Sequence, residues 1–199
     1  MHFTALFAAA SIAISGATAT PLSTTIDISS LFGTDLSASN HYGAPIAPWH
    51  SGANPGWYFG DHGQLFPDLL CLEGLLCKIL DLLPFDWLHC PVKPPPTPPP
   101  SDGYTQTFAN LTGATQADGY QTFGLVDTIA QCKAMCDAVQ GCKFVNTYHD
   151  VNGKGGSTQL TCALFDTCYD ASTATNTGGQ SQPDGSINFI TNSDGYCKQ

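Results

Sequence analysis

The chain has 199 residues and a formal net charge of −10, because sixteen acidic residues stand against six lysines and no arginine. Phosphate backbones and anionic lipids are bound through clustered positive charge, so a chain this poor in cations is repelled by them. The composition therefore argues against nucleic-acid partners and acidic membrane surfaces.

The first residues predict a secretory signal peptide, residues 1–19. An apolar run ends there in Ala17-Thr18-Ala19, a small-residue triplet typical of a cleavage site. The run is shorter than the roughly 20 apolar residues that a membrane span needs, and it breaks at Ser15-Gly16. We therefore expect a secreted, extracellular protein that is cleaved after Ala19 and has no membrane span.

Nine cysteines in an oxidising compartment are expected to be mostly paired. Six of them lie in the last 70 or so residues. Because six is an even number, these cysteines can all pair with one another within the C-terminal half of the chain. The other three, Cys71, Cys77 and Cys90, are an odd number. One of the three must pair across the halves, form an intermolecular disulfide or remain a thiol.

Between the predicted signal peptide and residue 91, the chain has two segments of different composition. Residues 20–64 are rich in Ser, Thr, Gly, Pro and aromatic residues without a sustained period, which predicts a loop-rich segment that is partly disordered. Residues 65–90 are leucine-rich, and the run 65–83 predicts one or two helices with a wide apolar stripe, stopped by Pro84. That stripe either packs on nearby aromatic residues as a small core or forms a docking surface.

Residues 91–102 predict a linker. Proline lacks a backbone donor and fixes φ, so the sequence Pro-Val-Lys-Pro-Pro-Pro-Thr-Pro-Pro-Pro of residues 91–100 excludes both helix and central strand. We expect a semi-rigid polyproline spacer that separates the upstream residues from a C-terminal domain, residues 103–199.

Helix signals are clear within this domain. Asp127 and Thr128 offer an N-cap, Thr128-x-x-Gln131 is a capping box and Gly141 is the expected stop, so a helix of about three turns is predicted. One face of that helix carries Ile129, Cys132, Cys136 and Val139.

Strand signals surround the helix. An outer strand is expected at Gly103–Leu111, a strand at Lys143–Tyr148 and a returning strand at Leu160–Phe165, with a turn over residues 153–156. A helix with two thiols on the face toward this hairpin can be joined to it by two disulfides, each worth about 2–4 kcal/mol. The expectation is a small disulfide-bonded α+β domain.

The cysteine pattern resembles the PAN/apple module. The pattern is Cys132-x3-Cys136-x5-Cys142-x19-Cys162, with an aromatic strand after the third cysteine and Ala163-Leu164-Phe165 after the fourth. The resemblance implies one helix packed on an antiparallel sheet, disulfides Cys132–Cys162 and Cys136–Cys142, and binding of protein or carbohydrate.

The match has one departure. Apple domains also carry a disulfide that joins their terminal strands, but no cysteine lies between Ser101 and Gln131. Cys168 and Cys197 are then left to pair with each other, and pairing of Cys197 with Cys90 is the weaker alternative. The whole layout is also similar to secreted proteins from fruiting bodies of mushroom-forming fungi.

Motifs of catalysis and metal binding are missing from the sequence. It has no Gly-x-Ser-x-Gly, no His-Glu-x-x-His and only one glutamate, Glu73. We therefore predict no catalytic residues, no enzyme activity and no cofactor. The spacing of His41, His50, His62 and His89 is irregular, so no metal site is predicted either.

The candidate binding loop is the hairpin that carries Tyr148, His149, Asp150 and Lys154, because loops on a rigid scaffold can present aromatic and polar contacts. An ordinary exposed turn is the alternative. The sole Asn-x-Ser/Thr sequence is Asn110-Leu111-Thr112, which predicts N-glycosylation at Asn110.

These observations favour a secreted, non-catalytic binding or adhesion protein, of fungal type, that recognises protein or glycan in the extracellular matrix or cell wall. The alternative is a structural or surface-active extracellular protein that assembles through the leucine-rich residues 65–83.

Overall fold

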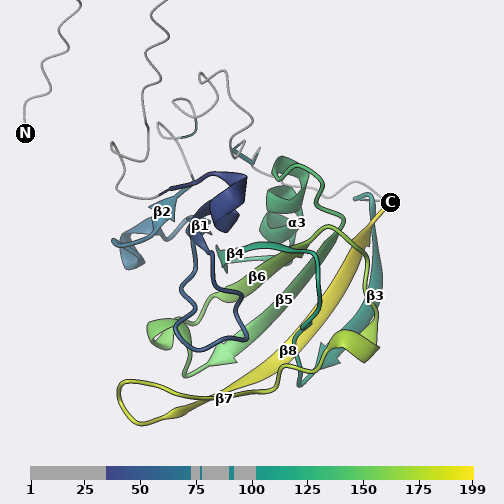
Figure 1. The fold of residues 1–199 in the computed structure, drawn as a ribbon. Coiled ribbons are helices and arrows are strands. Elements are labelled where there is room, and N and C mark those ends of the chain that lie inside the picture. Colours follow the sequence, from purple (N-terminus) through teal and green to yellow (C-terminus); the bar gives the residue numbers. More distant parts are fainter. Residues whose placement is uncertain (1–34, 73–76, 78–89, 92–101) are drawn as a thin grey trace, which may run out of the picture.

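The computed structural model describes residues 35–72, 77, 90, 91 and 102–199 (Figure 1). In this part of the chain, one mixed sheet carries the helix α3 on one face, an α+β architecture. The predicted signal peptide and residues 92–101 of the predicted linker lie outside the described residues. The elements are η1 (Ala38–Gly43), β1 (Trp57–Phe59), η2 (Gly63–Leu65), β2 (Leu70–Cys71), β3 (Tyr104–Leu111), β4 (Tyr120–Val126), α3 (Ile129–Ala138), β5 (Phe144–Val151), η3 (Lys154–Gly156), β6 (Leu160–Phe165), η4 (Ala171–Thr173), β7 (Gly178–Ser181) and β8 (Ile187–Lys198).

The strands follow the order β2-β1-β4-β6-β5-β8-β3, and β7 pairs with β8. The pairs β1–β2 and β1–β4 are parallel, whereas all the other pairs between described strands are antiparallel. The antiparallel sheet expected for residues 103–199 is present, because every pair of described strands within those residues is antiparallel. The parallel strands β1 and β2 come from upstream of the proline-rich residues and extend this sheet beyond β4.

The helix α3 begins where the capping box predicts. The Thr128 hydroxyl accepts a hydrogen bond from the Gln131 amide at 3.2 Å, and Gln131 Oε1 accepts one from the Thr128 amide at 2.9 Å. This reciprocal pair satisfies backbone donors that the first turn of a helix leaves without an intrahelical partner. The helix then buries Cys132, Met135 and Cys136 against the sheet.

The sheet has an apolar core on each face. The core between α3 and the sheet includes Trp57, Leu72, Met135, Val145 and Leu164. The core on the opposite face is rich in aromatic residues, and it includes Phe108, Phe123, Phe144, Tyr148 and Phe165. Residues of β5 contribute to both cores, because successive residues of a strand point to opposite faces of the sheet.

All nine cysteines lie among the described residues, and eight of them form four disulfides. Cys132–Cys162 joins α3 to β6, Cys136–Cys142 joins α3 to the chain that follows it, and Cys168–Cys197 joins a loop to the end of β8. These are the three pairs expected within residues 103–199. Upstream, Cys77 pairs with Cys90, and the ninth cysteine is Cys71 in β2.

The leucine-rich stretch differs from its prediction where it is described. Residues 65–72 complete η2 and form β2 rather than a helix, because Pro67 interrupts the run and Leu70 pairs with Trp57 of β1. Cys77 is helical. The other residues between 73 and 89 lie outside the described part.

Residues 35–72 are packed into the domain rather than separate from it. The Trp57 side chain is fully buried, its Nε1 donates to Thr122 Oγ1 at 3.0 Å, and it lies directly over Gly124 of β4. A Cβ at Gly124 would overlap the indole ring. Gly124 is thus required for the close approach of β1 to the sheet.

We expect Gly124→Ala to lower the free energy of unfolding by about 1–3 kcal/mol, because the added methyl group overpacks the site of Trp57. Urea denaturation followed by tryptophan fluorescence measures the effect. The exposed change Gln116→Ala serves as control, with an expected effect within about 0.5 kcal/mol. Equal stability of the two variants would contradict the proposed packing.

Candidate functional site

A cleft of about 330 Å³ lies where three segments meet. Residues 51–54, before β1, form one wall, and residues 180–183, from β7 and the turn after it, form another. The remaining lining comes from Asp150, residues 153–155 and Asn188. Its volume is at the lower end of the range for small-molecule sites.

A buried ion pair forms the polar centre of this cleft. Lys154 Nζ lies 3.3 Å from Asp150 Oδ2, and only 6% and 3% of the two side chains are exposed. Asn188 Nδ2 donates to Asp150 Oδ1 at 2.7 Å. Lys154 Nζ also lies 5.2 Å from the centre of the Phe123 ring, which adds a cation–π contact. The centre therefore contains one positive and one negative charge, and its net charge is zero.

The turn after β5 explains why the lysine reaches back to the aspartate. Lys154 and Gly155 have left-handed φ values of 51° and 67°, which fold the chain back over Asp150. Gly153 allows the approach, because a Cβ there would overlap the Asp150 carboxylate. The Gly153 amide donates to the Asp150 carbonyl at 3.0 Å and closes the turn.

This centre keeps capacity for further hydrogen bonds. Each carboxylate oxygen can accept two hydrogen bonds and an ammonium group can donate three, so Asp150 and Lys154 are not saturated by each other and by Asn188. Asn188 Oδ1 accepts from the Gln180 amide at 2.7 Å, which places β7 beside the centre. Asn54, Gln180 and Gln182 also line the cleft. The Asn54 and Gln182 amides each donate one hydrogen bond to a backbone carbonyl, of Gly52 and Gln180, at 3.1 Å.

Aromatic packing holds the wall formed by residues 51–54. The Trp49 ring stacks on Phe165 with 6.2 Å between centroids and 6° between planes, and the Tyr120 hydroxyl donates to the Ala44 carbonyl at 2.8 Å.

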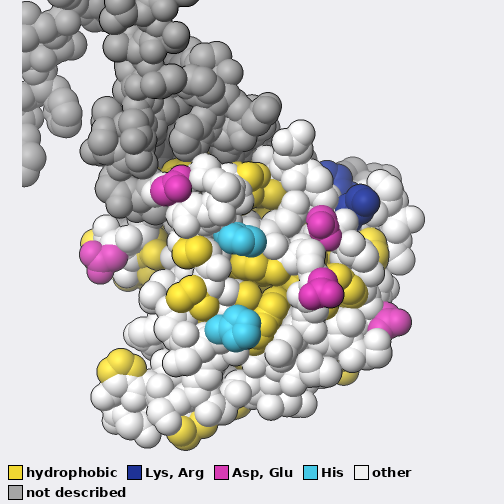
Figure 2. Space-filling view, in the orientation of Figure 1, with side chains coloured by type: hydrophobic (Ala, Val, Ile, Leu, Met, Phe, Trp, Pro, Cys, Tyr) yellow, Lys and Arg dark blue, Asp and Glu magenta, His cyan; other side chains and the backbone are white. Residues whose placement is uncertain are grey.

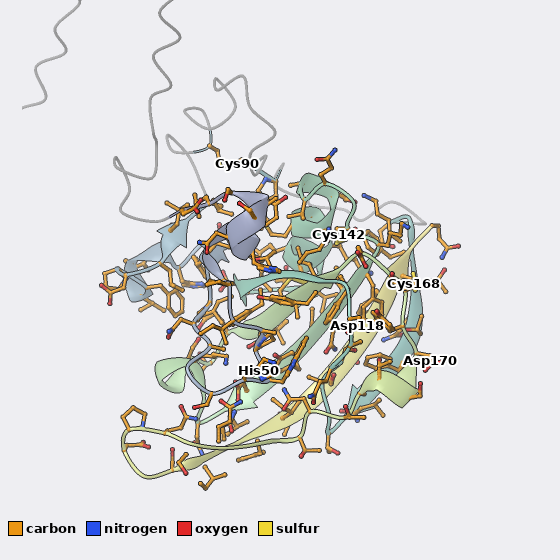
Figure 3. All side chains as sticks on the ribbon, in the orientation of Figure 1. His50, Cys90, Asp118, Cys142, Cys168 and Asp170 are labelled. Atoms are coloured by element: carbon orange, nitrogen blue, oxygen red, sulfur yellow. A yellow bond between two sulfur atoms is a disulfide. The ribbon has the colours of Figure 1, made fainter. Side chains whose placement is uncertain are left out.

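Hydrophobic side chains gather near two histidines on the face that Figure 2 shows. One histidine, His50, lies on this loop, whereas Cys142 and Cys168 lie toward the other end of the sheet (Figure 3).

The structure corrects the predicted binding loop. Tyr148 is 1% exposed within the aromatic core and does not line the cleft. Side chains of β5 alternate, and Tyr148 and Asp150 therefore share one face while His149 points to the other. His149 does not line the cleft but a neighbouring hollow, which Thr191 and Asp150 also line. Asp150 and Lys154 do line the cleft, but as a buried pair rather than as an exposed turn.

The other lining residues were missed by sequence reasoning. Asn54, Gln180 and Asn188 come from segments far apart in the chain, and no motif connects them. The alternation along β8 offered a weak signal for Asn188. Ile187 and Phe189 on either side of it are exposed, so this polar residue occupies a position that faces the core.

Two of the histidines considered as metal ligands, His41 and His62, have polar contacts within the fold. His41 Nδ1 lies 2.8 Å from the Gln121 carbonyl and its ring stacks on Tyr120, while His62 Nδ1 lies 3.0 Å from Asp127 Oδ2. No group of three or more His, Cys, Asp or Glu residues in this part of the chain could hold a metal ion. His89 lies outside the described residues.

Asn110 is exposed at the end of β3, where the pairing with β8 is irregular. It adopts a left-handed φ of 53°, and its Oδ1 accepts from Asn192 Nδ2 at 3.1 Å. The side chain on which glycosylation is predicted is therefore at the surface.

Comparison of the chain with protein-family models, with curated proteins and with solved structures finds no match. In the described ranges, no helix is long and apolar enough to cross a membrane. Function is therefore inferred from the residues of the cleft and from the sequence.

We expect Lys154→Met to lower the free energy of unfolding by about 3–5 kcal/mol, because it leaves the Asp150 carboxylate buried without its counter-charge. The double variant Asp150→Asn/Lys154→Met removes both charges and should recover part of the loss. Chemical denaturation of the wild type, both single variants and the double variant measures the coupling. Additive losses from the two changes would show that the ion pair does not stabilise the turn.

Proposed function

We propose that this protein is a secreted, non-catalytic binding protein that recognises neutral carbohydrate of an extracellular matrix or cell wall through the cleft at Asp150. The supporting observation is the Asp150–Lys154–Asn188 centre, which is buried, neutral in sum and open to further hydrogen bonds. Sugar hydroxyl groups act as both donors and acceptors, and this centre offers acceptors and donors side by side.

Charge distinguishes carbohydrate from other small ligands. A paired carboxylate and ammonium give the cleft no net charge to attract an ion, and the net charge of −10 repels anions at longer range. The amides of Asn54, Gln180 and Gln182 suit a hydroxyl-rich ligand better than an apolar one. A neutral sugar matches both properties.

The content of the cleft also supports a non-catalytic role. Hydrolysis of a glycosidic bond generally takes two carboxyl groups on opposite sides of the bond. Asp150 is the only acidic residue among those that line the cleft, and it is already paired with Lys154. The arrangement favours holding a sugar over cleaving it.

The proposal includes that the protein is secreted and that its C-terminal domain is of the PAN/apple type. Disulfides persist in oxidising compartments, so four of them support the export that the signal sequence predicts. The helix α3 is joined by one disulfide to β6 and by another to the chain that follows it, which supports a PAN/apple-like domain over residues 103–199. The parallel strands β1 and β2 are an addition to that pattern.

A protein ligand is a second candidate because of one observation. Ile187 and Phe189 are 51% and 47% exposed and lie on the same face of β8. Such a pair of exposed apolar side chains favours contact with another protein rather than with a sugar. Assembly through residues 65–83 stays an alternative, since most of that stretch lies outside the described residues.

Retention on insoluble polysaccharide tests the carbohydrate proposal. The whole mature protein is incubated with chitin, β-1,3-glucan and mannan particles, and bound and free protein are measured. Gln180→Ala should weaken binding to the retained polysaccharide by about threefold to tenfold through the loss of neutral hydrogen bonds. Gln116→Ala, the same change at an exposed site that does not line the cleft, is the matched control. No retention on any of the three, or equal weakening by both variants, would overturn the proposal.

The predicted glycan at Asn110 is tested separately from the cleft. Mass spectrometry of protein secreted from eukaryotic cells should show a mass loss on treatment with peptide-N-glycosidase. The variant Asn110→Gln should show no such loss. An unmodified Asn110 in secreted protein would exclude the glycan without affecting the cleft.

A further inference from the structure

Residues 35–72 complete the sheet of residues 102–199 although 29 residues separate the two segments in the chain. Within this contact, Tyr58 and Phe59 of β1 pair with Leu125 and Val126 of β4. The Gly56 amide donates to the Phe123 carbonyl at 3.0 Å and extends the pairing by one bond. The contact therefore has the geometry of strand addition at a sheet edge.

Trp57 anchors the added strand. Its side chain is fully buried in the core beneath α3, and its Nε1 donates to Thr122 Oγ1. The absence of a side chain at Gly124 leaves room for the indole ring. A buried aromatic residue in a complementary site is the usual anchor of a protein interface.

Asp127 forms a second anchor. The Tyr58 hydroxyl donates to the Asp127 carboxylate at 2.8 Å, the Asp61 amide donates to it at 2.9 Å, and His62 Nδ1 lies 3.0 Å from it. Burial alone would raise the pKa of Asp127, but these hydrogen bonds outweigh burial and hold the pKa below its usual range. The carboxylate is therefore charged at neutral pH and bonded largely by residues of the upstream segment.

No disulfide joins the two segments. Cys77–Cys90 lies upstream of residue 92, and the other three disulfides lie within residues 132–197. The contacts between these two segments that the structure describes are non-covalent. These include an apolar anchor, strand pairing and a charge-assisted cluster.

We propose that residues 102–199 carry a strand-addition site whose ligand is residues 35–72, and that this segment stays bound as a separate polypeptide after the chain is cut between them. The site recognises an extended Trp-Tyr-Phe sequence, the first residue through Gly124 and the second through Asp127. Cutting at the proline-rich residues then gives a stable two-chain protein. The inference does not depend on carbohydrate binding.

The test uses the full mature chain with a recognition sequence for a site-specific protease inserted after Thr97. Both Cys77 and Cys90 lie on the same side of the cut, so non-reducing denaturing electrophoresis shows two separate fragments. Size-exclusion chromatography without denaturant, at micromolar protein concentration and without polysaccharide, should show both fragments in one peak. Elution of the fragments in separate peaks would overturn the proposal.

Variants identify the contacts that hold the cleaved protein together. Tyr58→Phe removes the hydroxyl that donates to Asp127 and should raise the dissociation constant of the fragments roughly tenfold or more. Gly124→Ala should raise it further, and Ile46→Ala, at a site of the same segment that is 43% exposed, should leave it unchanged. If Gly124→Ala does not fold, the comparison of Tyr58→Phe with Ile46→Ala still tests whether Asp127 recognises the segment. Equal dissociation constants for these two would show that Asp127 does not recognise the segment.

Discussion

The close packing of Trp57 on Gly124 is the contact on which most of the structure depends. It brings β1 against β4, and the chain before β1 is thereby held over the aromatic face of the sheet, where Trp49 stacks on Phe165. Residues 51–54 lie between these two tryptophans and form a wall of the cleft. A residue that is fully buried in one core thus positions a wall of the cleft beside the other core.

Covalent and non-covalent constraints are divided between the two halves of the molecule. Residues 102–199 are held by three disulfides, two of which fix α3, so this half has a restricted unfolded ensemble. Residues 35–72 are held on it by hydrogen bonds and apolar contacts, with Asp127 as the main polar partner. The cleft draws on both halves, and its buried charges Asp150 and Lys154 belong to the disulfide-bonded one.

Sequence reasoning succeeded where the signal is local. The Thr128–Gln131 capping box located α3, and apolar residues flanked by turn residues located β6 at its observed bounds. It failed for β1, because three apolar residues between glycines have no period, and β1 is a strand only through pairing with β4. The lining of the candidate cleft could be predicted in part: Asp150 and Lys154 share one turn, whereas Asn188 and Gln180 reach them through tertiary structure. Tyr148 differs from its prediction because it lies beside a turn in sequence, whereas its ring packs in the aromatic core of the sheet.

The length of β8 has a mechanical consequence. This strand runs from Asn188 at the cleft to Cys197, and it pairs with β7 near one end, with β3 toward the other and with β5 along much of its length. Tension applied along the strand loads the hydrogen bonds with β5 and β3 together, in shear, rather than one after another. A molecule pulled from Cys197 would thus resist extension near that residue before strain arrived at the residues around Asn188.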